Sequence, residues 1–312
     1  MANYLVTGGA GFIGSNIVKT LLEKGERVRV VDDLSTGKRK NIEPFLGKID
    51  FVQSSLIHYD MCLRAVDGMD YILHQAAIPS VTRSVENPIR SNDANVTGTV
   101  NLLTAAKEKK IKRLVYAASS SAYGDVAVSQ KVETLKPQPR SPYAVSKLAG
   151  EYYCQAFYIC YGLETVSLRY FNVFGPNQDP TSQYSAVIPK FITSILRNEQ
   201  PSVYGDGTQS RDFTYVENNV LANLLACTAP KAAGEMMNIA CGDSTSLLDL
   251  IRLINETLGK NVKPLFHPPR SGDVKHSLAD ITKAREILGY KTVVPFKEGL
   301  RRAIQWYQGK SS

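Results

Sequence analysis

Short apolar runs and longer segments with helical periodicity alternate through the first half of the chain. The apolar, β-rich runs predict strands at Tyr4–Thr7, Val28–Asp32, Asp50–Val52, Tyr71–His74, Arg113–Ala117 and Glu164–Arg169. The segments between them predict helices at Phe12–Glu23, Tyr59–Val66, Val96–Lys109 and Tyr143–Tyr161. Alternation of this kind is typical of a parallel sheet covered by helices on both faces. We therefore expect an α/β fold with a doubly wound parallel sheet over residues 1–170.

The pattern changes after about residue 170, where glycine and proline become frequent, as in Gly175-Pro176 and Gly205-Asp206-Gly207. Helical periodicity remains at Val187–Leu196, Glu217–Cys227, Ser246–Leu258, Ile281–Leu288 and Phe296–Tyr307. Glycine and proline are the strongest local markers of turns and loops. We expect residues 171–312 to form mainly a smaller, loop-rich lobe, with a segment near 212–240 returning to the first domain.

Composition and charge exclude several classes of protein. No apolar run is long enough to cross a bilayer, and the start lacks the basic and apolar regions of a signal peptide, so we expect a cytoplasmic protein. The five cysteines have no metal-ligand spacing and are expected to be reduced thiols, without a metal. The net charge of +8 is dispersed along the chain, with its densest cluster at Lys38-Arg39-Lys40. This dispersal favours anionic small molecules over a nucleic-acid partner.

A glycine-rich turn lies between the first predicted strand and the first predicted helix. Gly8, Gly11 and Gly14 would allow a tight turn and close approach to a pyrophosphate, which the helix N-terminus would then face. The second strand ends in Asp32-Asp33, and a carboxylate there binds ribose hydroxyls but repels a 2′-phosphate. These features favour a Rossmann-like domain that binds NAD. A tight turn without a ligand is the alternative.

Tyr143 and Lys147 are four residues apart, so their side chains share one face of a predicted helix. A nearby ammonium and a positively charged nicotinamide would favour the phenolate and lower the tyrosine pKa toward the working range of a base. Upstream, Ser119-Ser120-Ser121 follow a strand and would lie at the sheet edge where ligands bind. An amphipathic helix and a helix-capping serine loop are the alternatives for these two motifs.

The order of motifs resembles the extended short-chain dehydrogenase/reductases, and within them the UDP-galactose and UDP-N-acetylglucosamine 4-epimerases. The motifs include Thr-Gly-Gly-x-Gly-Phe-Ile-Gly, Ser-Pro-Tyr-x-x-Ser-Lys and Arg-Tyr-Phe-Asn-Val-Phe-Gly-Pro, and the resemblance extends from Thr7 to Trp306. It implies that Tyr143 is the base, Lys147 its partner, and Ser119, Ser120 and Ser121 a hydroxyl relay.

The same resemblance implies contacts to NAD and to the sugar nucleotide. The implied NAD-binding residues are Gly8, Gly11, Phe12, Ile13, Gly14, Asp32, Asp33, Ser35, Thr36, Gly37, Ser55, Leu56, Gln75, Ala76, Ala77, Asn95, Tyr143, Lys147 and Tyr170. The implied substrate-binding residues are Ser80, Ser121, Tyr143, Asn172, Val187, Tyr204, Arg211, Arg270, Asp273 and Ser277. Among them, Arg211 and Arg270 match arginines that clasp the UDP phosphates, a role that suits the guanidinium fork.

The resemblance predicts 4-epimerisation of a UDP-hexose through a transient 4-keto sugar. The small Ser277 replaces a bulky residue of the epimerases that are restricted to unsubstituted hexoses, which favours UDP-GlcNAc and UDP-GalNAc, with UDP-Glc and UDP-Gal as further substrates. Ser55 replaces the aspartate that usually holds adenine, which weakens that contact. We also expect a homodimer that packs through Val96–Lys109 and Tyr143–Tyr161, as in the family.

Other functions remain open at this point. A 4,6-dehydratase is disfavoured, because Ser120-Ser121-Ala122 stand where that reaction uses an acidic pair. A UDP-glucuronate epimerase or decarboxylase, or another nucleotide-sugar enzyme of this family, is the alternative within the enzymes. A non-catalytic NAD-binding regulator is the alternative from a different class.

Overall fold

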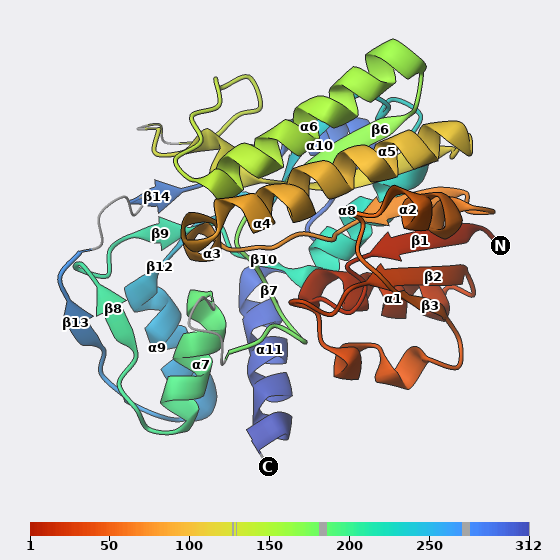
Figure 1. The fold of residues 1–312 in the computed structure, drawn as a ribbon. Coiled ribbons are helices and arrows are strands. Elements are labelled where there is room, and N and C mark those ends of the chain that lie inside the picture. Colours follow the sequence, from red (N-terminus) through yellow and green to blue (C-terminus); the bar gives the residue numbers. More distant parts are fainter. Residues whose placement is uncertain (127, 129, 181–185, 270–274, 312) are drawn as a thin grey trace.

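The computed structural model describes residues 1–126, 128, 130–180, 186–269 and 275–311. Its centre is a sheet of seven strands, in the order β11-β6-β5-β4-β1-β2-β3 (Figure 1). The strands are β1 (Asn3–Thr7), β2 (Arg27–Asp32), β3 (Asp50–Gln53), β4 (Tyr71–His74), β5 (Arg113–Ser119), β6 (Thr165–Tyr170) and β11 (Met236–Ile239). Every neighbouring pair is parallel, so the carboxyl ends of all seven strands lie at one edge.

Two layers of helices cover the sheet, because successive strand side chains point to opposite faces. In β5, Leu114 and Tyr116 pack in one apolar cluster with α2 (Tyr59–Val66), α5 (Gly98–Glu108) and α6 (Pro142–Tyr161). Val115 and Ala117 pack in the other cluster with α1 (Phe12–Glu23) and α8 (Val216–Thr228). The strand is apolar along its length because both of its faces are buried.

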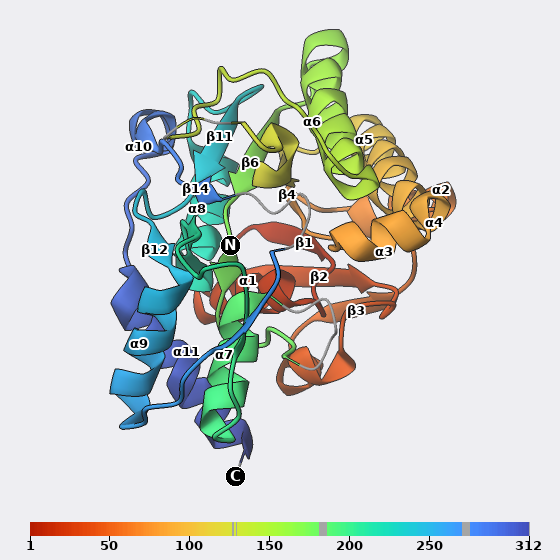
Figure 2. The same cartoon turned by 90° about the vertical axis from the view of Figure 1, so that its left-hand side faces the viewer.

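The remaining elements form a second group beside the strand ends. Helices α7 (Val187–Leu196), α9 (Leu247–Leu258) and α11 (Phe296–Ser311) lie together in both views, away from α5 and α6 (Figures 1 and 2). Short strands complete it: β8 (Ser202–Tyr204) with β13 (Leu265–His267), β7 (Val173–Phe174) with β10 (Thr214–Tyr215), and β12 (Thr245–Ser246), β9 (Ser210–Arg211) and β14 (His276–Ser277) in one small sheet. Helix α10 (Thr282–Leu288) lies near β11.

The expected doubly wound parallel sheet is confirmed. All six predicted strands are present, and the helices at Phe12–Glu23, Tyr59–Val66 and Val187–Leu196 have the predicted bounds. Strand β11 was not among the predicted strands. Although it follows residue 170, it pairs with β6 in the central sheet. The division of the chain into domains at residue 170 stays a prediction.

Two short helices were also missed, α3 (Val81–Glu86) and α4 (Pro88–Asn92). Their side chains are mostly exposed, so they show no apolar periodicity, and each begins with a capping side chain, Ser80 or Asn87. The predicted helix Val96–Lys109 was wrong at its start, where Asp93–Thr97 form a π-helical turn before α5. Within the described residues, no helix combines the length and the apolar character that a membrane crossing requires.

Candidate active site

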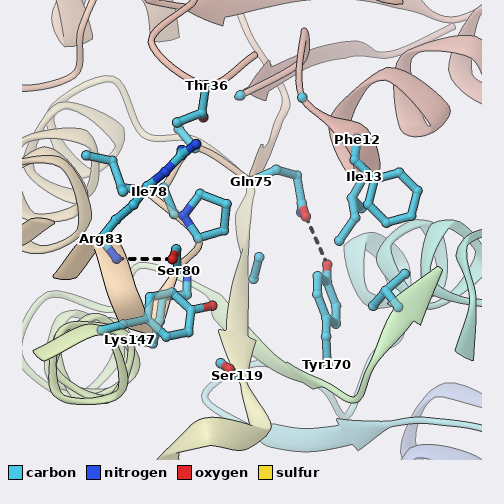
Figure 3. A pocket seen from close by; sticks show the side chains of 18 of the residues that line it. Phe12, Ile13, Thr36, Gln75, Ile78, Ser80, Arg83, Ser119, Lys147 and Tyr170 are labelled. Atoms are coloured by element: carbon cyan, nitrogen blue, oxygen red, sulfur yellow. Dashed lines mark hydrogen bonds between the residues drawn. The ribbon is translucent and has the colours of Figure 1, made fainter. Parts of the chain in front are cut away.

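A cavity of about 1050 Å³ lies at the carboxyl edge of the sheet and receives the loops that follow β1, β2, β3, β4, β5 and β6 (Figure 3). Most of the sequence-predicted site residues line it. These are Gly8, Gly11, Phe12, Ile13, Gly14, Asp32, Asp33, Ser35, Thr36, Gly37, Ser55, Leu56, Gln75, Ala76, Ala77, Ser80, Ser119, Ser120, Ser121, Tyr143, Lys147, Tyr170, Asn172, Arg211 and Ser277. Residues from six separate loops thus meet in one space.

The glycine turn is closed too tightly for side chains. Gly8 has φ +68°, and a Cβ there would lie 2.7 Å from the Ala76 Cα. A Cβ on Gly14 would lie 2.2 Å from the Gly8 carbonyl oxygen. Helix α1 begins after Gly11 without a side-chain cap, which leaves the N–H groups of its first turn available to an anionic ligand. The turn is therefore a cradle for a phosphate group.

Asp32 is a buried carboxylate that organises the neighbouring loop. Its oxygens accept hydrogen bonds from the backbone N–H groups of Ala10 at 2.9 Å and Leu34 at 2.8 Å. Burial raises its pKa, and these hydrogen bonds act in the opposite direction. Each oxygen retains a lone pair for a further donor such as a ribose hydroxyl. The glycine turn and this carboxylate together fit a dinucleotide such as NAD.

Tyr143 and Lys147 lie in the first two turns of α6, which begins at Pro142 with Ser141 as its cap. The Ser141 hydroxyl accepts a hydrogen bond from the Ala144 N–H at 3.1 Å, and Ser84 accepts one from the Tyr143 N–H at 2.9 Å. Lys147 is buried, and its ammonium lies 4.5 Å from the centre of the Tyr116 ring. Burial lowers the pKa of Lys147 to about 7, so only part of the population carries the protonated amine near neutral pH.

The serine loop lines the same cavity as the Tyr143 phenol. The Ser121 hydroxyl donates to the Ser119 hydroxyl at 2.8 Å, and the Ser121 N–H donates to it at 3.2 Å. Burial raises the pKa of Tyr143, while a hydrogen bond with the Ser119 side chain lowers it by less. In the protein alone, loss of solvent outweighs the polar neighbours. The expected lowering of the tyrosine pKa requires the bound nicotinamide and stays a prediction.

Three predicted site residues do not line the cavity. Asn95 is buried behind it, where it accepts a hydrogen bond from the Ile78 N–H at 2.8 Å and donates to the Ser146 hydroxyl at 2.9 Å. Val187 is the first residue of α7, and Tyr204 stacks on His267 with ring centres 5.0 Å apart. Arg270 and Asp273 lie outside the described residues.

Some cavity residues were not predicted from the sequence. Arg83 belongs to the unpredicted helix α3, and Figure 3 shows its side chain extending toward Thr36. Lys131, Asn177, Gln178 and Lys190 also line the cavity. The capping serine at position 80 could have identified α3, whereas the other four depend on contacts that are distant in the chain.

A ring of three hydrogen bonds fixes one wall of the cavity. The Tyr170 hydroxyl donates to the Gln75 side-chain carbonyl at 3.2 Å (Figure 3) and accepts from the Asn223 amide at 2.7 Å. The Gln75 amide donates to the Asn223 carbonyl at 3.0 Å. Because each side chain is held by the other two, Gln75 and Tyr170 present a defined surface to a bound ligand.

The chain is similar in sequence and in structure to known epimerases of sugar nucleotides. A putative UDP-glucose 4-epimerase from Methanocaldococcus jannaschii is 38% identical, over 98% of this chain and 99% of that protein. A UDP-N-acetylglucosamine 4-epimerase from Methanobrevibacter ruminantium, solved in complex with UDP-N-acetylmuramic acid, superposes with a TM-score of 0.95 at 38% identity. That alignment covers 99% of both chains. A UDP-glucose 4-epimerase from Thermotoga maritima, solved with UDP-glucose, has a TM-score of 0.94 at 38% identity, over 99% of this chain and 100% of that one.

The family profile described as "NAD dependent epimerase/dehydratase family" matches residues 4–240. That stretch contains the glycine turn, Asp32, the serine loop and the Tyr143–Lys147 pair. The profile covers most of the chain, and the relatives align with the chain over almost its whole length. The chain therefore belongs to the NAD dependent epimerase/dehydratase family.

Proposed function

We propose that this protein is an NAD-dependent 4-epimerase that inverts the C4 configuration of a UDP-hexose. The observation that carries the proposal is the position of Tyr143. Its phenol lies on the same cavity as the serine loop, the glycine turn and Asp32. One bound dinucleotide can therefore reach the residue that would handle the substrate proton. The epimerases among the relatives support the same reaction.

Two parts of the cavity would divide the binding. The dinucleotide end comprises Gly8–Gly14 and Asp32–Gly37. The sugar end comprises Ser119–Ser121, Arg211 and Ser277, together with Lys131. NAD, when bound, supplies the acceptor that takes hydride from C4 and returns it. Asp32 would hold its adenosine ribose, and the first turn of α1 its pyrophosphate.

The chain's own residues would move the proton. Tyr143 takes the proton of the 4-hydroxyl as the C4 hydrogen leaves with its electron pair, which produces a 4-keto sugar. After the sugar has turned over, the phenol returns the proton to the 4-oxygen as hydride arrives on the opposite face. Ser119, itself a hydrogen-bond acceptor for Ser121, holds the phenol and shares its proton. The Lys147 ammonium favours the phenolate once the site is filled.

Arg211 would bind the diphosphate, because a guanidinium at the cavity wall suits an anionic oxygen fork. Ser277 lines the cavity with a small side chain, which leaves room for a substituent on the hexose. We therefore favour UDP-GlcNAc and UDP-GalNAc as substrates, with UDP-Glc and UDP-Gal also accepted.

We also propose a cytoplasmic homodimer. On α6, Val145, Tyr152 and Ile159 are 52%, 52% and 71% exposed and are spaced seven residues apart, so they share one face. An exposed apolar face on a long helix is typical of a subunit interface. The five free thiols, three of them buried, suit a reducing compartment. Light scattering would report a monomeric mass if the dimer proposal is wrong.

The decisive experiment incubates the purified protein with UDP-Glc, UDP-GlcNAc and UDP-GlcA in separate reactions and identifies the products by NMR. We expect C4 epimers, with UDP-GlcNAc among the converted substrates. Release of CO2 from UDP-GlcA would identify a decarboxylase, and no product from any of the three would contradict catalysis altogether.

A further inference from the structure

Lys131 is a buried lysine on the wall of the active-site cavity. Its exposed fraction is 3%, and both it and Gly124 line the cavity. Its ammonium donates one hydrogen bond, to the Gly124 carbonyl oxygen at 3.1 Å. An ammonium has three donors, so two remain for another acceptor. No ion pair formed among the described residues includes Lys131.

Two chain segments place Lys131 at the sugar end. Its N–H donates to the Leu278 carbonyl at 2.8 Å, and the residue forms a parallel bridge with Ala279, two residues after Ser277. On the other side, Gly124 follows the serine loop by three residues. Lys131 is therefore bounded by the segment that carries the reactive hydroxyls and by the segment that carries the small Ser277.

The charge around Lys131 makes its burial unfavourable in the protein alone. Burial lowers the pKa of the ammonium, and the positive charge of Arg211 lowers it further, whereas Asp125 acts more weakly in the opposite direction. Burying a cation without an anionic partner is costly, and this cost falls when a ligand supplies acceptor oxygens. The site is thus suited to an electron-rich oxygen that arrives with the substrate.

We infer that Lys131 is a specificity-determining residue that binds the hexose and selects for ring substituents with a carbonyl or carboxylate oxygen. This inference rests on the proposed function, which places the hexose between Tyr143 and Arg211. Two oxygen sources share the required chemistry: the carbonyl of a 2-acetamido group and the carboxylate of a uronate. The small Ser277 leaves room for the first, and the Lys131 ammonium, which forms no ion pair among the described residues, favours the second.

The test measures dissociation constants by calorimetry on the NAD-loaded protein, for UDP-GlcNAc, UDP-GlcA, UDP-Glc and UDP alone. Lys131→Met removes the donors at similar length, and Lys131→Arg keeps them. We expect Lys131→Met to weaken one or both substituted sugars on the order of tenfold, UDP-Glc by at most about threefold, and UDP by less than about twofold. Lys131→Arg should stay within about threefold of the wild type for all four ligands.

Each outcome decides the question. Weakening of UDP-GlcNAc alone or of UDP-GlcA alone supports the inference and identifies the substituent. Equal weakening of all four ligands, UDP included, or no weakening at all overturns it. If Lys131→Met does not fold, Lys131→Leu, which also has no donor, takes its place. A wild-type protein that binds these sugars but converts none contradicts the proposed reaction, while the dissociation constants still decide the role of Lys131.

Discussion

At the dinucleotide end of the cavity the walls come from loops that directly follow parallel strands. At the sugar end only the serine loop does so, and it is joined by Lys131, Arg211 and Ser277 from segments that meet only in the folded chain. Gly8, Gly14 and Asp32 lie within 25 residues of one another and are fixed by backbone contacts. Lys131 and Ser277 meet through a bridge between residues 131 and 279. We therefore expect few substitutions to be tolerated at the dinucleotide end. At the sugar end, single substitutions can change which sugar is bound.

The strongest test of this division removes the chemistry that lies between the two ends. Tyr143→Phe should keep both NAD and UDP-hexose bound, because neither end is altered, and should lower turnover at least about 1000-fold by removing the proton carrier. Cofactor content and product formation measure the two effects. Tyr161→Phe, at the exposed last residue of the same helix, is the control and should turn over normally. Near-normal turnover of Tyr143→Phe would exclude the assigned role.

A second change should break the dinucleotide end alone. In Gly14→Ala the new Cβ must displace the Gly8 carbonyl, which lies 2.2 Å from its ideal position. We expect NAD affinity to fall about 100-fold and UDP affinity to change by less than about threefold. Gly47→Ala is the matched control, because nothing lies within 4 Å of the added methyl group. Parallel loss of both affinities would show that the two ends are not independent.

The same contrast explains what the sequence could predict. The glycine turn, Asp32 and the serine loop lie in short motifs next to strands with clear apolar patterns, whereas the Tyr143–Lys147 pair is marked by its four-residue spacing at the start of a helix. Strand direction alone therefore brings the first three to one edge. Lys131 had no such signal, since it reaches the cavity through its pairing with residues 278–279.

The pKa shifts of Tyr143 and Lys147 could not be predicted from the sequence. The four-residue spacing of Tyr143 and Lys147 correctly suggested a shared helix face. It could not show that burial would raise the tyrosine pKa and lower that of the lysine to about 7. Those directions depend on how completely distant segments exclude water from the two side chains.

A third change should alter the sugar end alone. Ser277→Tyr fills the space beside the hexose, so kcat/KM for UDP-GlcNAc should fall about tenfold or more while that for UDP-Glc stays within about threefold. NAD affinity should not change. Ser277→Ala, which keeps the space and the backbone hydrogen bond that Ser277 accepts from the Asp212 N–H, is the control. Intact N-acetyl activity in Ser277→Tyr would refute the role of this position in substrate selection.

The smallest expected effect concerns stability where the two ends meet. Lys147 has its pKa lowered to about 7 by burial, from an ordinary value of 10.5, so the unfolded chain binds its proton more tightly than the folded protein does. Stability is therefore reduced below pH 7 and recovers as the pH rises from about 7 to about 10.5. Lys147→Met should abolish this penalty and raise the Tm of the NAD-free protein by several degrees at pH 7, with the gain shrinking toward pH 10. Lys109→Met, at an exposed position, should show no such pH-dependent gain. A lower Tm for Lys147→Met at pH 7 would mean that the ammonium stabilises the fold. It would contradict the expectation that the buried Lys147 lowers the stability of the NAD-free protein.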